Sequence, residues 1–118
     1  MAEKILILLN DPPYGTERSY NGLRMALALA KADPEARIDV FLMADAVLCG
    51  KAGQRTPNGY YNLERMLRAV LRRGEVLACG SCMDARGLID GELVEGARRS
   101  TMDELARRTL DAGKVLVF

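Results

Sequence analysis

The residues best suited to chemistry in this chain are two cysteines three positions apart, Cys79 and Cys82, followed by Arg86. A cysteine reacts as the thiolate, and its pKa falls where backbone N–H groups or cations lie close to the sulfur. Cys79 follows a short apolar run and opens a Gly80-Ser81 turn, so the N–H groups of a following helical turn would favour its thiolate. Arg86 lies within reach and could stabilise an anion at the same place.

Other interpretations of these cysteines stay open. Free cysteine is among the most buried residue types, so Cys79 could serve only as a small apolar side chain. The C-x-x-C spacing is a weak signal, which suits a thioredoxin-like dithiol with Cys82 as a resolving thiol, or a neutral neighbour. A zinc site needs four ligands, and Cys49 is the only further thiol, so we predict no metal site. We interpret Cys49 itself as a packing residue.

The chain contains no histidine. This excludes Ser-His-Asp and Cys-His catalysis within one chain. The phosphate-binding patterns G-x-G-x-x-G and G-x-x-x-x-G-K-S/T are absent as well. Any chemistry must therefore use cysteine, carboxylates, arginine, lysine, tyrosine or backbone amides, and we predict no cofactor.

The elements that must position these residues follow from the apolar pattern. Strands are predicted over residues 4–9, 37–43, 75–78, 94–99 and 114–118. Helices are predicted over residues 16–31, 44–50 and 62–73, as a turn over 81–86, and from a capping box at Thr101 to Gly113. This alternation predicts an α/β fold with parallel strands and helices on both faces of the sheet. The Gly- and Pro-containing segment 50–59 is typical of a mobile loop.

Within the last of these helices, the apolar residues fall on one face, which we expect to be buried. They are Met102, Leu105, Ala106, Thr109 and Leu110.

Open parallel sheets bind ligands beyond the carboxyl ends of their strands. The segments that follow the predicted strands are therefore expected at one edge of the domain: residues 10–15, 44–45, Cys79 and 100–101. From these segments and the start of the first helix we predict a pocket around Cys79. Its expected lining residues are Asn10, Tyr14, Glu17 and Asp45.

Composition limits the class of protein. The 118 residues are 49% apolar and 28% charged, which predicts one globular domain over residues 1–118. A formal net charge of +1 gives no electrostatic basis for direct nucleic-acid binding or for attraction to an anionic membrane. No signal peptide or apolar stretch of membrane-spanning length is visible. We predict a cytoplasmic protein whose three cysteines are thiols.

The chain resembles the DsrE/DsrF-like family, and most closely its YchN-like branch. The resemblance rests on residues 10–17, 41–46 and 109–118, and on the pattern Cys79-x-x-Cys82-x-x-x-Arg86-Gly87. It implies a flavodoxin-like three-layer α/β/α fold with a mainly parallel five-stranded sheet, and a homotrimer or homohexamer. In sulfur-relay members, which act in tRNA thiolation or sulfur oxidation, the cysteine matching Cys79 accepts and passes on a persulfide. Cys82 is not required by that relay pattern.

Three hypotheses about function follow. The leading one is a persulfide carrier that uses Cys79, with a sulfur donor and a sulfur acceptor protein as partners. The second is a redox dithiol, in which Cys79 and Cys82 cycle through a disulfide. The third is a non-catalytic oligomeric binding module, in which Cys79 only lines a pocket.

Overall fold

The sheet of this protein has five parallel strands in the order β4-β3-β2-β1-β5. A computed structural model describes residues 2–118. The strands are β1 (Lys4–Leu9), β2 (Arg37–Leu42), β3 (Val76–Cys79), β4 (Arg98–Ser100) and β5 (Lys114–Val117). Four of the six residues of β1 and all four of β3 are buried, which explains their almost continuous apolar sequence.

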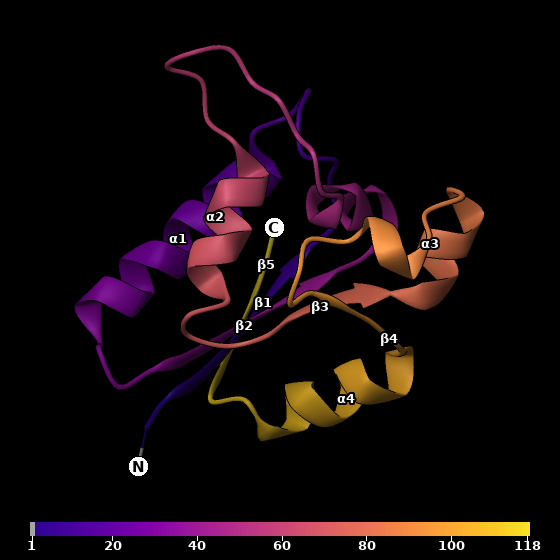
Figure 1. Ribbon diagram of the computed structural model, residues 1–118. Helices are drawn as coiled ribbons and strands as arrows, with labels where there is room; N and C mark the ends of the chain where they lie inside the picture. The colour runs from indigo at the N-terminus through magenta and orange to yellow at the C-terminus, as the bar shows by residue number, and fades with distance from the viewer. Residues whose placement is uncertain (1) are drawn as a thin grey trace.

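Helices cover both faces of this sheet, as Figure 1 shows. They are α1 (Arg18–Ala32), α2 (Leu63–Val70), α3 (Gly80–Ala85) and α4 (Met102–Asp111), with the 3-10 helices η1 (Ala44–Gly50) and η2 (Asp90–Glu92). Successive strands from β1 to β4 advance in one direction across the sheet, and the chain then returns past β1 to β5. Because crossovers are right-handed, this reversal puts α4 on the face opposite α1 and α2. The predicted three-layer α/β/α fold is confirmed.

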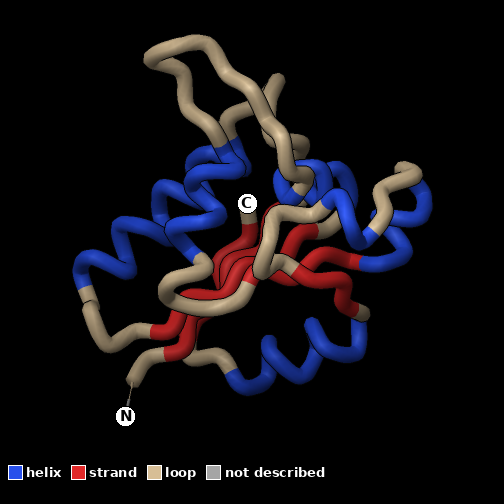
Figure 2. The backbone as a smooth tube through the Cα atoms, in the orientation of Figure 1, coloured by secondary structure: helices blue, strands red, loops and turns tan. Residues whose placement is uncertain are grey.

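The connections after β3 and β4 leave the sheet on opposite faces. The chain turns from β3 into α3, which packs against η1, whereas from β4 it turns into α4 (Figure 2). Adjacent strand ends whose connections diverge in this way form the crevice in which open α/β sheets bind ligands. Cys79 and Ser100, which are register partners, are the last residues of these two strands.

The fourth strand is shorter than predicted. Residues 94–97 were expected in it, but β4 begins at Arg98. The N–H of Val94 donates to the carbonyl of Gly50 at 2.7 Å, and Leu93 forms an antiparallel bridge with Lys51. The segment before β4 therefore pairs with the end of η1 and not with β3.

The helix predicted over 62–73 is also shorter. It ends at Val70, and a turn leads to Gly74. A Cβ atom at Gly74 would overlap the carbonyl oxygen of Ile38, so the glycine allows this turn to approach β2 closely. The guanidinium of Arg73 in the same turn donates to three carbonyl oxygens at the end of α1 and after it, those of Ala30, Asp33 and Ala36.

The loop over residues 50–59, predicted to be mobile, is anchored at Gln54. Its backbone N–H donates to the Glu64 carboxylate at 2.8 Å, and its side chain donates to the carbonyl of Cys49 at 2.8 Å. The Tyr14 hydroxyl donates to the Gln54 amide oxygen at 2.7 Å. Figure 2 shows the loop extending beyond α1 and α2, and residues 57–59 at its tip are exposed.

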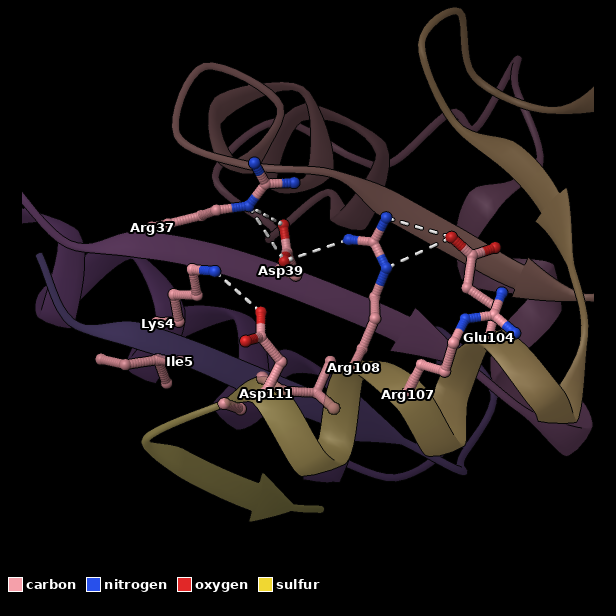
Figure 3. A pocket seen from close by; sticks show the side chains of 10 residues that line it. Lys4, Ile5, Arg37, Asp39, Glu104, Arg107, Arg108 and Asp111 are labelled. Carbon is pink, nitrogen blue, oxygen red and sulfur yellow. Dashed lines mark hydrogen bonds and ion pairs between the residues drawn. The ribbon is translucent and has the colours of Figure 1, made fainter.

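Helix α4 is held to the sheet largely by charged groups. Only Leu105 of its predicted apolar face is buried, so that expectation was wrong for the other four residues. Arg108 donates to the carboxylates of Asp39 and Glu75, which come from β2 and the residue before β3. Between α4 and the amino ends of β1 and β2 lies a cavity of about 430 Å³ lined mostly by charged side chains (Figure 3).

The predicted capping box at the start of α4 is half confirmed. The Thr101 hydroxyl accepts from the backbone N–H of Glu104 at 3.1 Å. The Glu104 carboxylate, however, accepts from Arg98 at 2.6 Å and from the Ser100 hydroxyl. The acid that should complete the box thus joins α4 to β4.

Candidate functional site

Cys79 is the last residue of β3 and the residue that caps α3. Its side chain is 5% exposed. The Ser81 hydroxyl lies 3.7 Å from its sulfur. Burial is the largest single influence on the pKa of Cys79, and it raises that pKa. Two groups of Cys82, its N–H and its thiol, and two groups of Ser81, its hydroxyl and its N–H, together outweigh burial. The pKa of Cys79 is therefore lowered. Of the two neighbouring thiols, Cys79 is therefore the one that forms a thiolate more readily.

The neighbouring thiol, Cys82, has the opposite tendency. Burial and its hydrogen bond to Cys79 raise the pKa of Cys82, while the N–H of Ala44 and the charge of Arg86 lower it less strongly. Of the two thiols, Cys82 is therefore the one that keeps its proton more readily. Environments that push two pKa values apart are typical of paired groups with different chemical roles.

Ala44 reaches Cys82 by means of an unusual backbone conformation. Its φ is 50°, the only positive φ among the non-glycine residues described, 2–118. Such a conformation costs about 1–3 kcal/mol and persists where the surroundings enforce it, often at functional sites. Here it falls at the first residue of η1, separated from the end of β2 by Met43, and the Ala44 N–H lowers the pKa of Cys82.

Arg86 lies beside Cys82 and away from the Cys79 sulfur. Its Nε donates to the Asp45 carboxylate at 2.8 Å, and its Nη1 donates to the carbonyl of Cys82 at 3.1 Å. Arg86 was expected to stabilise an anion on Cys79, but the groups that lower the pKa of Cys79 are the N–H and side chain of Cys82 and of Ser81. Asp45, expected in the pocket, is brought to the site as the partner that orients Arg86.

The other three expected pocket residues lie elsewhere. Tyr14 donates to Gln54 and accepts from the N–H of Leu63 at 3.3 Å, in the anchored loop. Its ring, with those of Tyr20, Tyr60 and Tyr61, forms an aromatic cluster against α1.

Asn10 donates to the carbonyl of Phe118, after the end of β5, and Glu17 is exposed at the start of α1. In the described part of the chain, none of the three has a hydrogen bond to either thiol.

Two residues that lie near the thiols could not be identified from the sequence. Ala44 was missed because an alanine gives no signal of a left-handed backbone, which favours glycine. The second is Arg99, whose guanidinium packs on the backbone of Gly80; a Cβ atom there would lie 2.7 Å from its Nε. Arg99 also binds the Asp84 carboxylate at 2.6 Å, which joins β4 to α3. The adjacent arginines of β4 gave no indication of this contact.

The third cysteine has the packing role expected of it. Cys49 is fully buried, and its thiol donates weakly to the carbonyl of Asp11 at 3.7 Å. Burial raises the pKa of Cys49 to about 12. At neutral pH this thiol remains protonated and unreactive.

The described residues, 2–118, contain no group of three acidic or cysteine side chains placed to bind a metal ion. Nor do they include a helix that is long and apolar enough to cross a membrane.

Fold and site together define a class of small α/β proteins with a cysteine at a strand end of a parallel sheet. The chain belongs to the DsrE/DsrF-like family, whose model matches residues 3–118. The Escherichia coli K12 protein YchN is 40% identical over 117 residues, which cover 98% of this chain and 99% of that protein. An uncharacterised protein of Methanopyrus kandleri is 35% identical over 97% of this chain and 93% of its own length.

Solved structures agree with this assignment. The crystal structure of E. coli YchN has a TM-score of 0.92 to this chain at 40% identity, covering 98% and 99% of the two chains. A protein of unknown function from Methanobacterium thermoautotrophicum has a TM-score of 0.78 at 14% identity and full coverage of both chains, which shows the shared fold. The expected membership in the YchN-like branch is confirmed.

Proposed function

We propose that this protein is a cytoplasmic persulfide carrier in which Cys79 accepts a sulfur atom from a donor protein and passes it to an acceptor. The observation that carries the proposal is the Cys79 thiol at the diverging strand ends, where local donors lower its pKa. A thiol favoured as the thiolate attacks sulfur more readily at neutral pH. Membership in a family with sulfur-relay members supports the same chemistry.

The transfer is a thiol exchange. The Cys79 thiolate attacks the outer sulfur of a donor persulfide, and the donor thiolate leaves with the electron pair of the broken S–S bond. The N–H groups of Ser81 and Cys82 remain directed at the sulfur of Cys79 and stabilise negative charge there. An acceptor nucleophile then attacks the outer sulfur and restores the Cys79 thiolate. No cofactor is required for either half of this exchange.

We also propose that the working unit is a homotrimer or a homohexamer. The face of β5 that points to the α4 side carries Val115 and Val117, which are 39% and 61% exposed. Leu110 on α4 is 88% exposed. Apolar residues gathered on one side of a small protein are typical of protein interfaces.

The experiment that tests the carrier is intact mass spectrometry after incubation with a cysteine desulfurase and cysteine, followed by peptide mapping. We expect one sulfur atom to be gained on Cys79, a gain that is retained in Cys82→Ser and lost in Cys79→Ser. Cys49→Ser is the matched control, since a hydroxyl can keep the hydrogen bond to Asp11. Full sulfur acceptance by Cys79→Ser would contradict the proposal. A Cys79–Cys82 disulfide formed with neither sulfur gain nor sulfide release would favour the redox dithiol. A protein in which neither cysteine is modified would favour the binding module.

A further inference from the structure

The two thiols are arranged so that one can act on a group carried by the other. Cys79 caps α3 and Cys82 lies in its first turn, which brings their side chains to one side of the helix. Each of the two thiols shifts the pKa of the other, as expected for two sulfur atoms close enough to interact. The spacing is the C-x-x-C of dithiol proteins, in which such a pair closes to a disulfide.

The surroundings of Cys82 form a cradle for negative charge, built from the N–H of Ala44 and the guanidinium of Arg86. Ala44 has a left-handed backbone, and its N–H lowers the pKa of Cys82. Arg86 is fixed beside Cys82 by the Asp45 carboxylate at 2.8 Å and by the carbonyl of Cys82 at 3.1 Å. A thiol that was only a packing residue would need neither an N–H donor in a strained conformation nor an oriented guanidinium.

The cradle formed by the Ala44 N–H and Arg86 affects Cys82 most strongly once Cys79 carries a sulfur atom as a persulfide. In the free protein, burial and the neighbouring Cys79 thiolate raise the pKa of Cys82, so that Cys82 keeps its proton. When Cys79 becomes a persulfide, the negative charge moves to the outer sulfur, and Cys82 loses that partner. The Ala44 N–H and Arg86 then stabilise the thiolate form of Cys82, next to the S–S bond of the persulfide.

We propose that Cys82 discharges the sulfur carried by Cys79 as hydrosulfide and leaves a Cys79–Cys82 disulfide. The inference rests on the proposed persulfide on Cys79. The proton of Cys82 passes to the outer sulfur, and the Cys82 thiolate attacks the inner sulfur, that of Cys79. The bond between the inner and outer sulfurs breaks, and the outer sulfur leaves with its electron pair as HS⁻. Cys82 is oxidised to the disulfide level as the carried sulfur is reduced to sulfide.

This chemistry identifies a class of partner. The disulfide returns to two thiols by exchange with a protein dithiol reductant, which supplies two electrons and two protons per cycle. The protein would thus consume persulfide and dithiol and release hydrosulfide. The half-buried position of Cys82, close to the exposed Arg86, leaves the disulfide open to such a partner.

The test is a single turnover without added reductant. The reduced protein is incubated with a cysteine desulfurase and cysteine, freed of both, and followed for dissolved sulfide and for the mass of each cysteine peptide. For the unmodified protein we expect about one sulfide per persulfide formed, with a Cys79–Cys82 disulfide. In Cys82→Ser the release should fall at least about tenfold, because the neighbouring thiol and its high effective concentration are lost.

The controls separate this inference from the carrier function. Cys49→Ser should release sulfide as the unmodified protein does, and Cys82→Ala repeats the test should the serine variant fail to fold. If the unmodified protein keeps its persulfide as long as Cys82→Ser does, the discharge is overturned and the carrier stands. If Cys82→Ser, which cannot discharge sulfur, takes up none on Cys79, the carrier function itself is wrong.

Discussion

At the scale of single residues, the roles of the two thiols depend on their effect on each other. The Cys82 thiol helps to lower the pKa of Cys79, and Cys79 helps to raise the pKa of Cys82. We predict that Cys82→Ala raises the pKa of Cys79, because the thiol donor disappears while the backbone N–H of residue 82 remains. The measurement is the rate of alkylation of Cys79 by iodoacetamide against pH, with peptide mapping.

The unmodified protein should react first at Cys79 and only at higher pH at Cys82, while Cys49 stays unreactive in the folded state because it is buried. An alkylation profile of Cys79 that is identical in Cys82→Ala would mean that the two sulfurs do not interact. Equal reactivity of all three cysteines only after unfolding would support the binding module in place of the carrier.

The sequence predicted which thiol stands at a strand end but not what surrounds it. Cys79 could be placed because the apolar run before it is a buried strand, and strand ends gather at one edge. Arg86 could not be placed, since a long side chain pairs with whichever carboxylate the fold supplies, here Asp45, 41 residues away. Tyr14 and Glu17 were misplaced because their segment, although it follows β1, turns toward the anchored loop.

At the scale of elements, the attachment of α4 should depend on acid. Arg98, the Ser100 hydroxyl and Arg108 lower the pKa of Glu104 to about 2, against some opposition from burial. A carboxyl whose pKa is lowered on folding adds stability above its unfolded pKa of 4.5, and this stability is lost as pH falls toward 2. We predict that Glu104→Gln lowers the free energy of unfolding at pH 7 by about 1–2 kcal/mol, since solvent screens part of the pairing.

Urea denaturation at pH 7 and at pH 2.5 measures this effect. The difference between the unmodified protein and Glu104→Gln should shrink at the lower pH, where the native carboxyl begins to take up its proton. A destabilisation of the same size at both values would assign it to packing and not to charge. Asp103→Asn, which changes an exposed acid on the same helix, is the control.

The elements themselves were predictable where apolar residues recur at a clear period. Strands β1, β2 and β5 and helix α1 were placed to within two residues, because their buried faces leave a strong pattern. The bounds of strand β4 could not be predicted in this way, since its three residues are two arginines and a serine. These residues form a strand because they pair with β3. The apolar residues of α4 do recur along one face, but the sheet beneath the helix presents charges, so all of them except Leu105 are exposed.

At the scale of the whole molecule, these exposed apolar residues point to self-association. A single helix, α4, covers one face of a five-stranded sheet, and Figure 1 shows it along only part of that face. Val115 and Val117 of the edge strand β5 and Leu110 of α4 are left exposed. An uncovered edge strand with apolar residues is a liability that proteins resolve by pairing or by covering it. A homotrimer or homohexamer would cover it with further copies of the same chain.

Light scattering at micromolar concentration tests this assembly, with an expected mass of about three or six times the 13.0 kDa of one chain. We predict that Val117→Asp shifts the protein to monomer, because burying an unpaired carboxylate at an interface is strongly unfavourable. Met25→Asp is the matched control: Met25 is 43% exposed on α1, on the opposite face of the sheet, and its replacement should leave the mass unchanged. A 13.0 kDa particle for the unmodified protein would contradict the assembly, and each thiol pair would then have to work alone.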